Sequence, residues 1–359
     1  MPQSTRRERL KKLSLAAGPP GAEADVRRLV RDELQGLGRI ESDRIGSLIC
    51  HGSSGHDGPR LVLDSHLDEV GFMVQSIATD GRISFVPLGG WWSHVLLGQR
   101  VTILTDDKKI PAVVGCTPPH HLSEEQRARL LPLEAMYFDA GASSRHAVEA
   151  LGVRVGDFVV PDSPFVDMAT PGVVCGKALD NRIGVALMIE ALQNASKTGR
   201  LPNQLIGVAS AQEEVGARGA ITAAAVAKPD VAIVLECTPA DDVPPIGEPQ
   251  GRLGGGPQLR YFDPTAIGNR ALVRWIETLA DEQDIPLQKA VRRGGGTDAG
   301  TLHRYGVGVP TAVIGVPGRY IHSHVSMMQW SDFDAAIQLV DLIVHRLDAD
   351  VASSFTTFE

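Results

Sequence analysis

Five short stretches of the sequence place an acidic residue or a histidine directly after an apolar run. They are LVLDSHLDE, KALDNRIG, SAQEEVGARGA, VAIVLECTP and RYIHSH. Ligands of open α/β folds bind beyond the carboxyl ends of the strands, so this recurrence is the expected layout of a site there. Two histidines and several carboxylates suit a pair of borderline divalent ions such as zinc or cobalt. The candidate residues are His66, Asp68, Asp180, Glu213, Glu214, Glu236 and His322.

Each of these stretches also has an ordinary structural explanation when it is taken alone. Asp180 could cap the helix that follows it, Glu214 could be a surface charge, and His322 could be a hydrogen-bonded core imidazole. The acidic segment LDSHLDEVGF could be a polar turn between two strands. Buried ionised carboxylates are costly unless they are paired or bound to a metal, however. Taken together, the stretches therefore favour a metal centre.

Several motifs, in this order and at these separations, resemble the M42 glutamyl aminopeptidase family of di-metal exopeptidases, which includes the tetrahedral aminopeptidases. The similarity rests on HLDEVGF, ALDNRIG, QEEVGARGA, GGTDAG and RYIHSH, and it extends to GGWWSHVLLGQRV, CTPPHHL, FDAGASS and LGVRVGD. The resemblance thus spans nearly the whole chain. It implies an aminopeptidase acting on short peptides.

The resemblance also implies roles for individual residues. One metal ion would be bound by His66 and Glu236 and the other by Glu214 and His322. The bridging ligand between the two ions would be Asp180, preceding a cis peptide bond to Asn181. The remaining two roles are a general base, Glu213, and a carboxylate that orients the first histidine, Asp68.

One position departs from the pattern of the family. The family commonly has Asp where this chain has Glu236 in the stretch VLEC. Glutamate is one methylene longer, so its carboxylate reaches the metal only if the backbone lies further away or the binding mode differs. We nevertheless expect Glu236 to be a ligand, because the nearby alternatives Cys237, Asp241 and Asp242 do not end the strand.

The elements that must position these residues show two different sequence patterns, one in each part of the chain. An amphipathic helix is predicted over 24–37, and short segments at 47–50 and 60–63 are interpreted as outer strands of a sheet. After residue 178, helices and strands alternate, which predicts an α/β sheet flanked by helices. Helices are expected at 184–192, 219–227, 269–281 and 330–347, and strands at 205–209, 231–235 and 311–316.

Between these parts, short β-type runs separated by turn signals predict an insert rich in β-strands. The runs cover 72–77, 82–85, 100–104, 110–114 and 157–160, with one polar helical stretch at 123–131. The resemblance implies a catalytic domain of the zinc-exopeptidase type, which would be formed by residues 1–70 and 164–359. Residues 71–163 would form a barrel-like or PDZ-like insert. The resemblance implies that this insert forms dimers, which can assemble into dodecamers.

Composition excludes some classes of protein. The chain of 359 residues has 43% hydrophobic and 22% charged residues and a formal net charge of −8. No basic block is present, so nucleic acid is not an expected partner. No apolar run approaches transmembrane length, and the apolar stretch at 13–17 is too short for a signal peptide. The widely spaced Cys50, Cys116, Cys175 and Cys237 predict free thiols in the cytoplasm.

Two further functions remain open on the sequence alone. A related di-metal amide hydrolase would act on a modified dipeptide or an acylated amino acid instead of a general peptide. A catalytically inactive assembly protein would use only its β-rich insert. The preferred N-terminal residue of a substrate and the physiological metal are not specified by these motifs.

Overall fold

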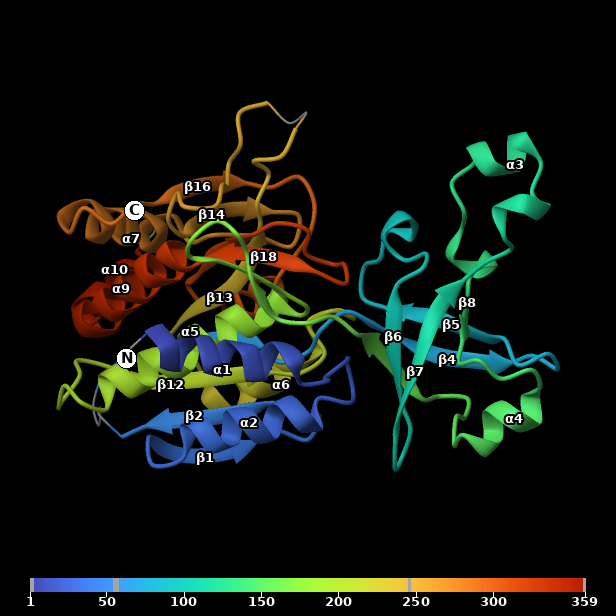
Figure 1. Cartoon of the computed structure of the whole chain (residues 1–359). Helices are drawn as coiled ribbons and strands as arrows, with labels where there is room; N and C mark the ends of the chain where they lie inside the picture. The colour runs from blue at the N-terminus through green and yellow to red at the C-terminus, as the bar shows by residue number, and fades with distance from the viewer. Residues whose placement is uncertain (1–2, 54–57, 245–246, 358–359) are drawn as a thin grey trace.

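The computed structural model describes residues 3–53, 58–244 and 247–357. The chain forms two parts, a large sheet covered by helices and a β-barrel that stands beside it (Figure 1). It leaves the sheet after strand β3 (Arg60–His66) and enters the barrel at β4 (Gly71–Ile77). It leaves the barrel after β9 (Phe158–Pro161) and returns to complete the sheet. The segment LDEV that joins β3 to β4 therefore lies between the two parts.

Within the described ranges, the large sheet has nine strands in the order β1-β2-β12-β3-β13-β17-β14-β15, with β16 paired to β14. The four central strands are parallel, and the outer pairs are mostly antiparallel. Besides β3, the strands are β1 (Gly38–Ser42), β2 (Leu48–Gly52), β12 (Gln204–Ser210), β13 (Val231–Pro239), β14 (Gln258–Asp263), β15 (Ala266–Ile267), β16 (Gln288–Val291) and β17 (Thr311–Gly318).

The central strands are apolar on both faces because helices cover both sides of the sheet. In β3, Leu61 and Leu63 face one core cluster, and Val62 faces another. The first cluster lies under α1 (Gln3–Leu15), α2 (Ala24–Leu34), α5 (Leu179–Ala195), α7 (Arg270–Glu282) and α9 (Trp330–Arg346). The second lies under α6 (Arg218–Ala227) and the short α8 (Ala299–Leu302). A last helix, α10 (Ala349–Ser354), follows α9.

Helix α5 lies unusually close to the centre of the sheet. A Cβ atom added at Gly184 would lie 2.2 Å from the carbonyl oxygen of Leu235 in β13, so a larger residue does not fit there. The amide of Asn181 donates a hydrogen bond of 2.8 Å to the same oxygen. The sequence DNRIG therefore fixes the start of α5 against β13.

The barrel is closed, with its described strands in the order β4-β5-β8-β7-β6-β9. Its core contains an aromatic cluster in which Phe72, Phe85 and Phe138 are in mutual contact. Closure leaves no unpaired sheet edge. The remaining barrel strands are β5 (Ile83–Leu88), β6 (Arg100–Leu104), β7 (Lys109–Gly115) and β8 (Tyr137–Asp139), and the loops carry α3 (Glu124–Ala128) and α4 (Arg145–Ala150). A small sheet of β10 (Val166–Asp167), β11 (Val173–Gly176) and β18 (Ser326–Gln329) lies outside the barrel.

The predicted architecture is confirmed at the level of a mixed sheet flanked by helices, together with a β-barrel. One strand assignment was wrong. The segment at 60–63 was interpreted as an outer strand, but β3 lies between β12 and β13 at the centre of the sheet and continues to His66. None of the helices formed by the described residues combines the length and the apolar character needed to span a bilayer.

Candidate active site

The carboxyl ends of the central parallel strands bring the first candidate residues to one edge of the sheet. Ser210, the last residue of β12, lies opposite His66, the last residue of β3. On the other side of β3, Val234 lies opposite Asp64. Glu236 therefore lies level with His66, since both are two residues further along parallel strands.

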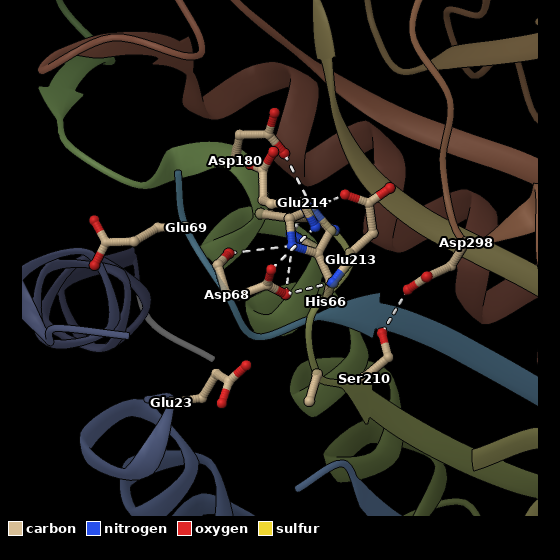
Figure 2. A network of polar contacts seen from close by, with 12 residues as sticks. Glu23, His66, Asp68, Glu69, Asp180, Ser210, Glu213, Glu214 and Asp298 are labelled. Atoms are coloured by element: carbon tan, nitrogen blue, oxygen red, sulfur yellow. Dashed lines mark hydrogen bonds and ion pairs between the residues drawn. The ribbon is translucent and has the colours of Figure 1, made fainter. Parts of the chain in front are cut away.

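The imidazole of His66 is buried, and its two nitrogens have different surroundings. Nδ1 lies 3.1 Å from the backbone oxygen of Asp68 and 3.5 Å from its carboxylate. Nε2 lies 3.3 Å from Asp180 Oδ1 and 3.8 Å from Glu236 Oε2. Asp68 thus holds one side of the ring while the other side faces carboxylates, as Figure 2 shows.

Glu213 and Glu214 are held by a turn that follows β12. The backbone oxygen of Glu213 accepts hydrogen bonds of 2.8 Å from the amides of Gly216 and Ala217. The two carboxylate oxygens of Asp68 accept the amides of Glu213 and Glu214, at 2.9 and 3.0 Å. One buried carboxylate therefore fixes both the His66 ring and the backbone of the acidic pair.

The first turn of α5, which contains Asp180, and the loop after β17 complete the site. The peptide bond between Asp180 and Asn181 is cis, as expected. His322 follows β17, and its Nε2 lies 3.5 Å from Asp180 Oδ2 and 3.6 Å from Glu214 Oε2. Its Nδ1 lies 2.8 Å from the backbone oxygen of Gly90, which belongs to the loop after barrel strand β5. The barrel therefore contributes directly to the orientation of His322.

Potential ligand atoms gather into two groups that share Asp180. The first group is His66, Asp180 and Glu236, and the second is Asp180, Glu214 and His322; within each group the atoms lie within 4.8 Å of one another. The longer side chain of Glu236 thus still reaches the first group. Glu213 is in neither group, and its Oε2 lies 3.9 Å from His66 Nε2.

The electrostatics of these groups fit divalent cations. Burial raises the pKa of Glu213 and Glu236 well above their usual range, and neighbouring carboxylates add to the effect. Burial likewise raises the pKa of Glu214 to about 8. Although burial also acts to raise the pKa of Asp180, hydrogen bonds from His322 and His66 lower it. Two imidazoles and crowded carboxylates form a nitrogen and oxygen donor set that a cation would stabilise.

The structure thus brings all seven sequence-predicted residues into one site, while their individual roles stay predictions. Sequence reasoning missed the contribution of Gly90, although GGWW was among the quoted motifs. It also missed the arginines of the neighbouring cavity, which has a volume of about 420 Å³ and opens onto the site. Their signal was weak because Arg260, Arg292 and Arg304 lie far apart in the sequence and belong to no common motif.

Histidines and carboxylates gathered at the carboxyl edge of a mixed sheet, and open to a cavity, define the class of metal-dependent hydrolases. The chain belongs to the M42 glutamyl aminopeptidase family, whose sequence model matches residues 46–339. The protein is therefore an aminopeptidase, a hydrolase that removes N-terminal residues from peptides. Peptidases of this family are metal-dependent, in agreement with the two groups of candidate ligands.

Relatives with known names and structures cover almost the whole chain. The FrvX protein of Escherichia coli K12 is 39% identical, over 98% of each chain. The glutamyl aminopeptidase of Lactococcus lactis is 34% identical over 98% of this chain and 99% of its own. The lysyl aminopeptidase of Pyrococcus furiosus is 32% identical over 95% of this chain and 97% of its own.

Two solved structures share the fold closely. A TET aminopeptidase from a marine sediment thaumarchaeon superimposes with a TM-score of 0.96 at 40% identity, covering 99% of this chain and 100% of its own. The TET1 peptidase of Pyrococcus horikoshii, described as assembling into a tetrahedron or a large octahedral shell, has a TM-score of 0.84 at 30% identity. That match covers 95% of this chain and 100% of the other.

Proposed function

We propose that this aminopeptidase binds two divalent metal ions, zinc or cobalt. One ion would be held by His66 and Glu236 and the other by Glu214 and His322, and Asp180 would be a ligand in both groups. The observation that carries the proposal is the pair of three-residue ligand groups that share Asp180 and no other residue. A carboxylate with one oxygen toward each histidine is suited to that bridging position.

The protein residues around the centre then have separate tasks. When bound, the two ions would polarise the scissile carbonyl and lower the pKa of the attacking water. Glu213, which belongs to neither ligand group, accepts the proton of that water and passes it to the leaving amine. Asp68 keeps the His66 ring oriented and holds the backbone amides of Glu213 and Glu214, so the base and the ligand share one support.

The substrates we propose are short peptides with a free N-terminal amine. The cavity of about 420 Å³ accommodates a few residues at most. The named relatives include a glutamyl and a lysyl aminopeptidase, so membership of the family does not determine which N-terminal side chain is preferred.

We also propose the division of the chain into a catalytic domain, residues 1–70 and 164–359, and a dimerisation insert, residues 71–163. The barrel strands fall inside this insert. The assembly of the Pyrococcus horikoshii relative into a tetrahedron or a large octahedral shell supports a homo-oligomer. The four cysteines, all in the described part of the chain, are free thiols, which supports a cytoplasmic location.

The experiment that tests this function uses metal-free enzyme reloaded with zinc, cobalt or manganese. A panel of short peptides is incubated with each form, and released free amino acids are identified. We expect sequential release of N-terminal residues by at least one reloaded form and none by the metal-free form. Hydrolysis confined to N-acylated amino acids or modified dipeptides would overturn the proposal in favour of an amide hydrolase.

A further inference from the structure

The loop that carries His322 has an unfavourable backbone conformation. It connects β17 to β18 and comprises residues 319–325. Tyr320 and His322 have φ angles of 61° and 56°, in the left-handed region that residues other than glycine rarely adopt. Such a conformation persists only where the surrounding contacts impose it. The position of His322 therefore depends on the contacts that hold this loop.

Some of these contacts are local and fix the shape of the loop. Arg319 and Met327 exchange two backbone hydrogen bonds of 3.0 Å, which close the loop at its base. The hydroxyl of Ser323 lies 2.8 Å from the backbone oxygen of Tyr320 and 2.6 Å from that of Val325. Because these contacts join neighbouring residues, they do not set the position of the loop relative to the other candidate ligands.

An ion pair ties the base of the loop to the segment after β13. Arg319 donates two hydrogen bonds to Asp242, from Nε to Oδ1 at 2.7 Å and from Nη2 to Oδ2 at 2.6 Å. A bidentate pair of this kind fixes orientation as well as distance. The two side chains are only 31% and 12% exposed, so solvent screens this pair less than one on the open surface. Asp242 is itself held, because its Oδ2 also accepts the amide of Leu253 at 3.1 Å.

The ion pair connects the two candidate ligand groups through the backbone. Glu236 of the first group lies in β13, and Asp242 follows shortly after that strand. The amide of Ala240 donates a hydrogen bond of 2.9 Å to the backbone oxygen of Gly318, so the segment after β13 runs beside the end of β17. The loop with His322 of the second group begins at the next residue. The pair therefore sets the direction in which this loop leaves the sheet.

The placement of His322 is critical for the second ligand group. Its Nε2 lies 3.5 Å from Asp180 Oδ2 and 3.6 Å from Glu214 Oε2. Zinc binds such atoms at about 2.0–2.2 Å, so two ligands of one tetrahedral ion lie about 3.4 Å apart. The observed separations match this value. A displaced loop would remove His322 from the second group and leave the first group unchanged.

We propose that Asp242 is a positioning residue for His322 and that it acts through its ion pair with Arg319. This inference rests on the metal centre proposed above. Neither Asp242 nor Arg319 is among the described residues that line the cavity, and the loop is the connection between their pair and the site. Loss of the pair should weaken binding of the ion in the second group, while the ion in the first group keeps its affinity.

The test titrates the metal-free protein with zinc in the presence of a competing chelator and measures the affinity of each ion. Asp242→Asn should weaken one of the two ions by about 10- to 100-fold, and Arg319→Gln should do the same. The double variant should be no worse than either single variant, because both changes remove one interaction.

The matched control is Asp230→Asn, which should leave both affinities unchanged. Asp230 accepts two hydrogen bonds from the guanidinium group of Arg60, at 3.0 and 2.9 Å, beside the opposite end of β13. It therefore removes an ion pair of the same kind from the same strand, away from the loop that carries His322.

A second background separates a positioning role from a general structural one. In His322→Ala the ligand itself is absent, so adding Asp242→Asn should cause no further loss of metal affinity. Arg319→Lys keeps the charge but not the planar fork, and it should lose less affinity than Arg319→Gln. Urea denaturation of each metal-free variant shows whether it folds, and if Asp242→Asn does not, the two Arg319 variants decide by the same criteria.

Two results overturn the inference while leaving the metal centre intact. One is a folded Asp242→Asn protein that binds both ions as tightly as the unchanged protein. The other is a loss of affinity that is equally large in the His322→Ala background. An unchanged protein that binds fewer than two ions would instead contradict the proposed metal centre, and the inference with it.

Discussion

At the scale of single residues, the acids of the segment LDSHLDEVGF can be buried because each of them has a different partner. Asp68 holds His66 and two backbone amides. Glu69, to which the sequence assigned no role, accepts two hydrogen bonds of 2.6 Å from the buried ammonium group of Lys177. Burial raises the pKa of Asp64 well above its usual range, and the nearby charge of Asp298 adds to this effect.

The Glu69–Lys177 pair leads to a prediction about stability. Replacing Lys177 by Met leaves the Glu69 carboxylate buried with Arg182 at 3.5 Å as its remaining charged neighbour. Removing one partner of a buried ion pair costs about 3–5 kcal/mol. We expect Lys177→Met to lose about that much stability in chemical denaturation. The double variant Glu69→Gln with Lys177→Met should recover part of the loss. A loss below about 1 kcal/mol in the single variant would show that the pair is not important.

At the scale of elements, long segments with clear periodicity could be predicted from the sequence. The predicted helix at 330–347 corresponds to α9, and the predicted strand at 231–235 forms the first half of β13. The segment at 60–63 was interpreted as an outer strand because it was taken as one of two short alternating segments, and the polar residues after Leu63 were not assigned to it. Those polar residues are buried because the site lies at the sheet centre, a tertiary effect that local pattern does not contain.

Helix α1 could not be predicted for a related reason. Its sequence QSTRRERLKKLSL is rich in basic residues and has little amphipathic pattern. Arg9 is nevertheless buried and donates a hydrogen bond of 3.0 Å to Glu33. Only the folded chain provides that partner. The seven site residues, in contrast, could be predicted because each follows an apolar run and matches a family motif.

The loop after β5 leads to a prediction at the scale of elements. The Gly90 oxygen orients His322, and a Cβ atom added at Gly90 would lie 3.2 Å from His322 Nδ1. We expect Gly90→Ala to displace the ring and weaken binding of one metal ion by about 10- to 100-fold. Metal titration of the metal-free protein measures this. The control is Gly247→Ala, because a Cβ atom at Gly247 meets nothing within 4 Å. Equal affinities in both variants would contradict the role of the loop.

At the scale of the whole molecule, the barrel contacts the active site and also exposes apolar side chains to solvent. It stands beside the sheet as a separate β structure (Figure 1), yet its Gly90 loop reaches His322. It also exposes large apolar side chains, among them Trp92, Leu97, Val113 and Leu130, with 62%, 43%, 43% and 56% of their surface exposed. Such groups commonly mark surfaces that bind another subunit.

The exposed apolar residues of the barrel lead to a prediction about assembly. We expect a dimer, or a multiple of one, at micromolar concentration in light scattering, with the barrel at the subunit interface. Val113→Asp combined with Leu130→Asp should shift the protein toward smaller species, because a buried unpaired carboxylate opposes association. A monomeric unchanged protein, or a double variant with the same mass distribution, would argue against this interface.

The proposed mechanism requires two adjacent acids with different tasks, Glu213 as base and Glu214 as ligand. The most direct test is metal content by atomic spectroscopy, measured beside turnover for Glu213→Gln and Glu214→Gln. We predict that Glu213→Gln keeps two ions per chain but loses about 10²- to 10⁴-fold in kcat, which added metal does not restore. Glu214→Gln should bind metal more weakly and regain part of its activity when metal is added. A Glu213→Gln protein that lacks metal, or that stays active, would contradict the account.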